Sequence, residues 1–220
     1  MRFVDAAMVG VQSMNKKIIA SSTALIFGAI GSATAARAQT PYDNLEFYLG
    51  AHGGVLFGDG ELYDDVGGIF DTSNATLGLL GVLGGMNIRN EYWFFGVEAD
   101  VGFALDSSIP SGPCGGVDLC DITTTGHVRG RVGYMLGNVD LFVAGGLALA
   151  HAEMNVLSAS HTKTLTGVTI GAGADIAVSD KLKARVEVLH DDYGDKEFAP
   201  GYGVKNWSDN TVRAAAIFTF

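Results

Sequence analysis

Two histidines stand beside carboxylates in a way that could support acid–base chemistry. His190 is followed by Asp191 and Asp192, and His151 lies two residues before Glu153. An imidazole that is oriented by a carboxylate is the base that activates a serine nucleophile in many hydrolytic sites. Neither histidine has a serine at a spacing that dictates contact. We therefore predict that both histidines lie at loop edges, that the chain has no catalytic residues and that it is not an enzyme.

An acidic cluster offers oxygen atoms of the kind that bind calcium. Asp59, Glu61, Asp64 and Asp65 lie close together, but without the regular spacing of a calcium-binding loop. The five histidines are spread over separate segments, so they do not form the close set that a metal site requires: His52, His127, His151, His161 and His190. We expect a solvated acidic loop, no metal ion and no other cofactor.

The two cysteines of the chain are Cys114 and Cys120. They do not form a Cys-x-x-Cys motif, and no histidine lies close to them in sequence, which argues against a redox or metal-binding role. In an oxidising compartment outside the cytoplasm we expect them to form a disulfide. The short ring would shape the loop that contains them more than it would stabilise the whole fold.

The composition resembles that of a membrane protein without its usual helical pattern. Of 220 residues, 48% are apolar and only 17% are charged, with 31 glycines and 4 prolines. Such a chain is neither disordered nor collagen-like. A membrane-spanning helix needs about 18 or more consecutive apolar residues, and no such run follows residue 40. The net charge of −10 argues against nucleic-acid binding, which requires a basic surface.

The first 38 residues have the three-part layout of a secretory signal peptide. Met14–Lys17 is basic, Ile18–Ile30 is mostly apolar, and Ala36–Ala38 supplies small residues at a cleavage site. We expect residues 1–38 to be removed and residues 39–220 to form the folded domain. Residues 1–13 add no recognisable feature, so the sequence leaves the start of translation open between the first methionine and Met14.

The remainder of the chain alternates between apolar and polar positions. In Trp93–Asp106 the odd-numbered positions are apolar, and the even-numbered positions are mostly small or acidic. A β-strand places successive side chains on opposite faces, so this pattern predicts a strand with one apolar face. The same pattern recurs over 123–136, 168–179, 182–191 and 211–220, and more weakly in glycine-rich segments near 45–57, 75–88 and 141–154. Together these segments predict eight strands.

Short turns alternate with longer polar loops between these strands. We expect the turns at 87–91, 137–140 and 179–181, and the loops at 58–74, 106–121, 155–165 and 191–209. Outer-membrane barrels have short turns on the periplasmic side and longer loops outside the cell. Tilted strands of about 9–11 residues cross a bilayer, and an even number of them leaves no open edge. The pattern predicts an all-β fold, an eight-stranded antiparallel up-and-down transmembrane β-barrel in the outer membrane of a Gram-negative bacterium.

The polar faces of the predicted strands carry charges of both signs: Glu98, Asp100, Arg129, Arg131, Asp175, Lys183, Arg185, Glu187 and Arg213. If Glu46 also faces inward, acids and bases are equal in number. An eight-stranded barrel is just wide enough for side chains to fill it, so we predict a lumen plugged by ion pairs and no diffusion pore. A soluble lipocalin-like barrel, with these charges in water, stays open as the alternative because the sequence does not show which face is outside.

Several segments resemble a known family. Arg129–Tyr134 followed by Leu141–Ala148 is similar to the central hairpin of the small porin-like outer-membrane β-barrel family, the outer membrane protein beta-barrel domain common in alphaproteobacteria. Residues 96–100 and 210–213 resemble its third and last strands. Phe218 and Phe220 resemble the C-terminal signal by which such barrels are recognised for assembly.

The resemblance implies a structural role in which the barrel stabilises the envelope and displays its loops. The implied partners are outer-membrane lipid, the barrel-assembly machinery and extracellular ligands at the long loops. Two alternatives stay open: a haem- or host-surface-binding receptor or adhesin, and a lipid A-modifying enzyme built on His190 or His151. Five aromatic residues would give the loops a contact surface or form a girdle at the headgroups: Tyr63, Phe70, Phe198, Tyr202 and Trp207.

Overall fold

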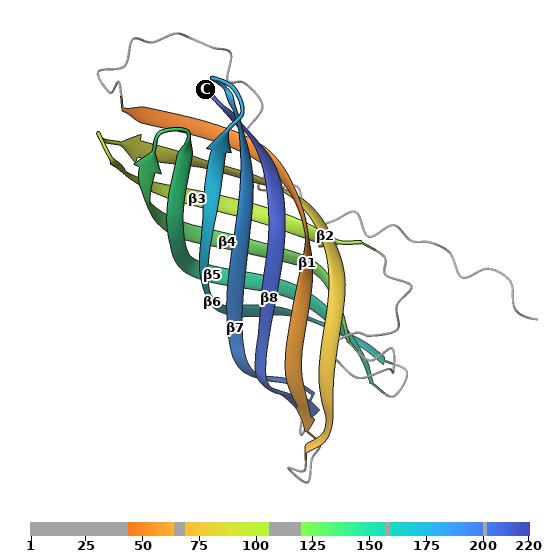
Figure 1. The fold of residues 1–220 in the computed structure, drawn as a ribbon. Helices are drawn as coiled ribbons and strands as arrows, with labels where there is room; N and C mark the ends of the chain where they lie inside the picture. Colours follow the sequence, from red (N-terminus) through yellow and green to blue (C-terminus); the bar gives the residue numbers. More distant parts are fainter. Residues whose placement is uncertain (1–43, 64–68, 106–119, 157–158, 200–201) are drawn as a thin grey trace, which may run out of the picture. The chain divides into compact units, whose positions relative to one another are not determined.

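The protein is an eight-stranded β-barrel. The computed structural model describes residues 44–63, 69–105, 120–156, 159–199 and 202–220. The strands are β1 (Leu45–Tyr63), β2 (Ile69–Arg89), β3 (Trp93–Ala104), β4 (Cys120–Leu136), β5 (Val139–Val156), β6 (Ala159–Ala177), β7 (Leu182–Ala199) and β8 (Tyr202–Thr219). Each pairs antiparallel with its neighbours in chain order, and β1 pairs with β8 to close the barrel (Figure 1). The predicted fold is confirmed. No helix within the described residues is long and apolar enough to cross a membrane.

The short turns lie at the end of the barrel that also carries the C-terminus (Figure 1). They comprise 90–92 between β2 and β3, 137–138 between β4 and β5, and 178–181 between β6 and β7. Gly137 adopts a φ of +64°, a left-handed conformation that glycine accepts without steric cost. Because short turns mark the periplasmic side of outer-membrane barrels, the opposite end is the extracellular one.

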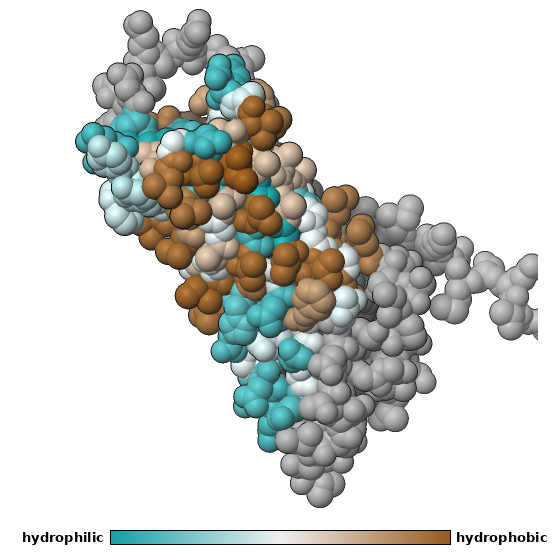
Figure 2. Space-filling view, viewed as in Figure 1, coloured by the Kyte–Doolittle hydropathy of each residue, from teal (hydrophilic) through white to brown (hydrophobic). Residues whose placement is uncertain are grey.

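The side chains of the barrel wall face the way that a membrane requires. On β3, Phe95 and Val97 are 60% and 50% exposed on the outer surface, whereas Glu98 is only 2% exposed on the inner surface. Apolar residues form a broad exposed area on the outside of the barrel (Figure 2). A lipocalin-like barrel would have the opposite facing, with its apolar face inside and its charges in water. The structure therefore supports the transmembrane barrel over the soluble alternative.

Three of the predicted loops are wrong in their bounds because the strands continue through them. Most of 58–74, 155–165 and 191–209 belongs to the hairpins β1–β2, β5–β6 and β7–β8. Asp59 and Glu61 accordingly lie in β1 and not in an acidic loop; Asp64 and Asp65, like residues 106–119, lie outside the described residues.

The polarity of the wall inverts in these extended hairpins. Leu56, Leu165 and Trp207 are buried inside the barrel, while polar residues such as Asp59 and Asp192 are exposed outside it. Figure 2 shows polar colours on the outer surface toward the end that lies away from the C-terminus. The sequence pattern of a lipid-facing strand stops where the outer face meets water, although the strand itself continues.

Candidate functional site

The lumen of the barrel gathers the charged residues that the sequence placed on polar strand faces. Glu98 on β3 lies at the centre of these contacts and is buried. Its Oε1 atom accepts a hydrogen bond from Arg129 Nη2 at 2.5 Å. Its Oε2 atom accepts hydrogen bonds from Tyr48 OH at 2.8 Å and from Arg185 Nη1 at 2.5 Å. Arg131 Nη1 lies 3.2 Å from the same oxygen. One carboxylate therefore joins side chains of β1, β4 and β7 across the lumen.

Four further contacts form a closed ring of alternating charges. Arg129 Nη1 donates to Glu187 Oε1 at 2.7 Å, and Arg213 Nε donates to Glu187 Oε2 at 2.8 Å. Arg213 Nη1 donates to Asp100 Oδ1 at 3.0 Å, and Arg129 Nη2 lies 3.2 Å from Asp100 Oδ2. Hydrogen bonds between ionised groups are stronger than neutral ones, and each member of this ring is buried. The ring connects β3, β4, β7 and β8.

Aromatic side chains line the lumen on the periplasmic side of the closed ring of charges. Asp175 accepts hydrogen bonds from Arg185 Nε at 2.6 Å and from Arg131 Nη2 at 3.1 Å. The Arg131 guanidinium carbon lies 4.0 Å from the centroid of the Phe142 ring, and that of Arg185 lies 4.9 Å from it. At these distances each cation interacts favourably with the face of the ring.

Glycines on neighbouring strands make room for these rings. A Cβ atom at Gly133 would overlap the Phe94 ring, and one at Gly173 would lie 2.6 Å from the Phe142 ring. Both glycines are directly opposite the aromatic residue in the strand register. The glycine content of the chain thus reflects in part the need to fit large side chains into a narrow lumen.

A second ring of ion pairs lies at the periplasmic mouth. Arg89 Nη1 is 3.2 Å from Glu46 Oε1 and 3.0 Å from Asp140 Oδ2. Lys183 Nζ is 3.0 Å from Glu46 Oε1 and 3.3 Å from Asp140 Oδ2. The sequence pattern did not identify Arg89 and Asp140 because both were expected within turns. Asp140 lies two residues before the inward-facing Phe142 on β5. Because residues two apart on a strand face the same side, the alternation along this strand could have identified Asp140 as a lumen residue.

His127 extends the charged network toward the extracellular end. Its Nδ1 atom lies 2.8 Å from Asp100 Oδ1, and its Nε2 atom lies 2.9 Å from Asp191 Oδ2. His127 follows the same alternation as Arg129 and Arg131, and Asp191 follows that of Glu187. Neither residue is among the lumen residues predicted from the sequence. The alternation of inward and outward positions along each strand could have identified both.

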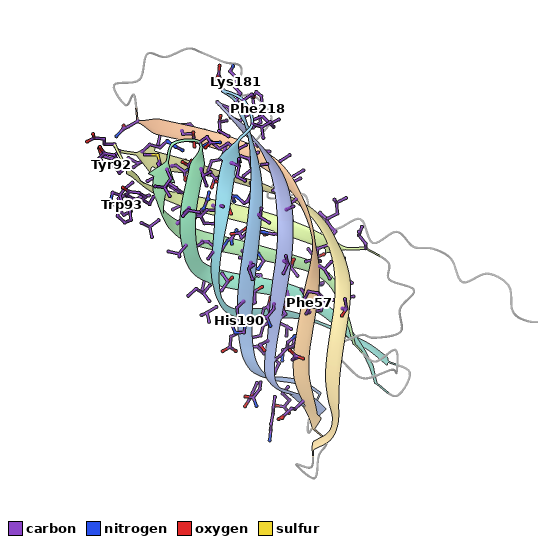
Figure 3. The ribbon with its side chains drawn as sticks, viewed as in Figure 1. Phe57, Tyr92, Trp93, Lys181, His190 and Phe218 are labelled. Atoms are coloured by element: carbon purple, nitrogen blue, oxygen red, sulfur yellow. The ribbon has the colours of Figure 1, made fainter. Side chains whose placement is uncertain are left out.

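Among the described side chains, neither candidate histidine is hydrogen-bonded to a carboxylate; the side chain of Glu153 lies outside them. His190 faces outward (Figure 3), and its Nδ1 lies 3.0 Å from Asn210 Oδ1. Asp191 is buried inside the barrel. His151 Nδ1 lies 3.1 Å from Thr164 Oγ1 on the neighbouring strand. Within the described ranges, no three or more His, Cys, Asp or Glu side chains are grouped so as to hold a metal ion.

Exposed aromatic residues surround the periplasmic end of the barrel. The Trp93 and Tyr134 rings meet edge to face with centroids 5.0 Å apart, and Phe218 and Phe220 do so at 5.2 Å. Figure 3 shows Trp93 and Phe218 at this end, together with Tyr92 and Lys181. Such a girdle places amphipathic rings at the headgroup level.

Trp207 is not on a loop surface, which corrects the sequence-based expectation. It is 0% exposed inside the barrel, and its ring centroid lies 6.1 Å from that of Tyr193. The expectation was wrong because β8 begins before this residue and turns it inward.

The structure does not describe the side chains of Tyr63, Phe70, Phe198, Tyr202 and Cys120, and residues 1–38 and Cys114 also lie outside its described part. The disulfide and the signal peptide stay predictions.

Comparison with known proteins agrees with this architecture. Residues 23–218 match the family described as outer membrane protein beta-barrel domain. The chain belongs to this family. A 22 kDa outer membrane protein of Rhizobium leguminosarum bv. viciae is 30% identical over 170 residues, which are 76% of this chain and 74% of the relative. The 25 kDa outer-membrane immunogenic protein of Brucella abortus is 28% identical over 132 residues, 59% of each chain.

The chain is also similar to solved structures of outer-membrane proteins. Neisserial surface protein A is 15% identical, with a TM-score of 0.49, and the match covers 79% of this chain and 97% of that one. Because members of the outer membrane protein beta-barrel family are named as outer membrane proteins, the predicted location in the Gram-negative outer membrane is confirmed.

Proposed function

We propose that this member of the outer membrane protein beta-barrel family is a structural protein with a closed lumen, which stabilises the envelope and carries its extracellular loops beyond the lipid surface. The observation that supports the closed lumen is the two layers of ion pairs, partly exposed at the periplasmic mouth and buried from Asp175 to His127. Passage of an ion would require breaking pairs that are shielded from water, where an uncompensated charge is costly.

A buried apolar cluster adds a second barrier on the extracellular side. Its larger members are each 5% exposed or less: Leu56, Leu77, Leu79, Ile122, Leu165, Tyr193 and Trp207. Apolar side chains inside the barrel exclude water from the part of the lumen that the ion pairs do not occupy. The ion pairs and the apolar cluster together support a barrel that serves as a rigid support and not as a channel.

The extended hairpins support the loop-displaying role. The exposed apolar residues of the outer wall, such as Phe95, Val97, Val168 and Ile170, form an apolar belt. The hairpins β1–β2, β5–β6 and β7–β8 continue as paired strands beyond this belt. A paired and internally packed hairpin holds its tip at a defined distance from the membrane, which an unstructured loop of the same length does not.

Conductance across a planar bilayer tests the closed lumen. We expect the purified protein to show at most small and sporadic openings, and Arg129→Ala to open the lumen further. Lys181→Ala, a change in an exposed turn residue, serves as the control and should behave like the unmodified protein. Sustained conductance steps from the unmodified protein would overturn the closed lumen. For the structural role, a deletion strain should become more sensitive to detergents, and the plasmid-borne gene should restore resistance.

A further inference from the structure

One buried carboxyl group of the lumen lacks a counterion. Asp209 on β8 is 0% exposed. Neither of its carboxyl oxygens receives a hydrogen bond from a donor in the part of the chain that the structure describes. The residue lies directly opposite Asp191 on β7, and both side chains are buried on the inner face of the β7–β8 pairing. Two acidic side chains therefore face each other across β7 and β8 inside the barrel.

The surrounding groups do not supply a positive charge to Asp209. His127 on β4 contacts Asp191 Oδ2 and Asp100, and Arg213 on β8 is paired with Asp100 and Glu187. The other inward groups around the pair carry no fixed charge: His52 and Gly58 on β1, Thr169 on β6, and Tyr193 and Trp207, which both lie on the extracellular side of the pair. The nearby cations are already committed to other carboxylates.

Among the described residues, the buried or ion-paired charges inside the barrel do not balance unless one more positive charge is present. The acids are Glu46, Glu98, Asp100, Asp140, Asp175, Glu187, Asp191 and Asp209. The bases are Arg89, Arg129, Arg131, Lys183, Arg185 and Arg213, to which His127 adds one charge as an imidazolium between two carboxylates. One negative charge is left over, and it falls on the acid without an ion pair. An unpaired buried carboxylate neutralises itself by taking up a proton.

We propose that Asp191 and Asp209 form a proton-binding site that holds one proton between the two carboxyl groups at neutral pH. The Asp209 carboxyl group donates to Asp191, whose other oxygen contacts His127. The site rests on the closed lumen proposed above, since water in an open lumen would solvate Asp209 and remove the need for the proton. The two groups titrate as a pair, so the proton belongs to the site and not to one residue.

The pH dependence of unfolding tests this site. Above the range where free aspartate ionises, about pH 4, the folded barrel would hold one proton more than the unfolded chain. The free energy of unfolding then falls as pH rises. For each pH unit, the factor by which the unfolding equilibrium constant rises is about tenfold larger than in a variant without the shared proton. We expect Asp209→Asn, whose amide replaces the proton-bearing group, to lose this additional slope between about pH 5 and pH 7 in urea unfolding of the detergent-refolded protein.

A matched control and a change of salt distinguish a bound proton from a bound metal cation. Asp192→Asn alters the neighbouring acid that faces outward and is exposed, and it should keep the slope of the unmodified protein. Repeating the titrations in sodium, potassium and choline chloride should give the same slopes. A stability that follows the sodium concentration instead would show that a cation neutralises the pair and would overturn the proposal.

Infrared spectroscopy keeps the proposal falsifiable if a variant fails to fold. The unmodified protein labelled with ¹³C-aspartate should show the C=O band of a protonated carboxyl group at neutral pH, and Asp209→Asn should lack it. Absence of the band from a barrel that does not conduct overturns the proton site and leaves the closed lumen intact. Sustained conductance overturns the closed lumen independently of the band, so the two failures are distinguishable.

Discussion

At the scale of single residues, Arg129 illustrates how the lumen is held together. Its guanidinium is fully buried and lies within 3.2 Å of oxygens from three carboxylates, Glu98, Asp100 and Glu187. Breaking a buried pair by removing one partner is costly because the remaining charge is left uncompensated. Here one substitution would leave three acids without their shared partner.

Arg129→Met is therefore expected to lower the free energy of unfolding by about 3–5 kcal/mol, although it preserves much of the length and apolar stem of the side chain. Urea titration of the protein refolded in detergent micelles measures this change. Lys181→Met removes a positive charge from an exposed turn and should change the stability by less than about 0.5 kcal/mol. A loss below about 1 kcal/mol for Arg129→Met would mean that the ion pairs contribute little to the barrel.

At the scale of the strand, the same alternation serves two environments. On β3 the outward positions meet lipid, so an apolar side chain is required there, while the inward positions carry the acids of the lumen. On the extracellular part of β6 the outward positions are polar, as at Thr164 and Thr166, and the inward Leu165 is buried. The depth of an outward position along its strand should then decide how well it tolerates a charge.

Val97→Arg places a charge on the lipid-facing side of β3, well inside the apolar belt. We expect a cost of about 2–4 kcal/mol, since arginine near the bilayer midplane is expensive on the lipid face of a barrel. Thr166 has a side chain of nearly the same shape as valine and also faces outward, but it lies beyond the apolar belt. Thr166→Arg should therefore cost about 0–1 kcal/mol. Refolding titrations into lipid vesicles measure both, and equal costs would contradict the assigned depth.

At the scale of the whole molecule, the barrel combines two kinds of interior in one continuous wall. The membrane part has a charged lumen and an apolar exterior, and the extracellular part has an apolar interior and a polar exterior. The chain has two tryptophans, one on each surface of the barrel wall. Trp93 is 51% exposed on the outer surface, and Trp207 is buried inside the barrel.

Fluorescence quenching distinguishes the two positions. In vesicles of brominated lipid, Trp207→Phe, which keeps Trp93, should lose most of its emission. Trp93→Phe, which keeps Trp207, should be quenched far less by the lipid and also little by aqueous iodide. Strong iodide quenching of Trp207 would instead place it on an exposed loop and contradict the inverted interior.

The sequence by itself determined the strand number, the antiparallel order and the separation of each membrane strand into an apolar and a polar face. Period-two alternation is a local property, so it can be read from residues such as those of Trp93–Asp106 without knowledge of their partners. It also placed the main lumen charges on polar faces. It failed at the extracellular ends, where Trp207 and Asp209 were assigned to a loop because the outward face there is no longer apolar.

Only the tertiary structure decided which face is outside and which charges meet. Alternation reads the same in a soluble barrel and in a membrane barrel, because exchanging inside for outside leaves the period unchanged. Contacts such as Glu98 with Arg185, 87 positions apart, depend on barrel closure and on the register of every intervening strand. The opposition of Asp191 and Asp209 arises in the same way, since a cross-strand neighbour is set by the register of the β7–β8 hairpin and not by either residue's own surroundings in sequence.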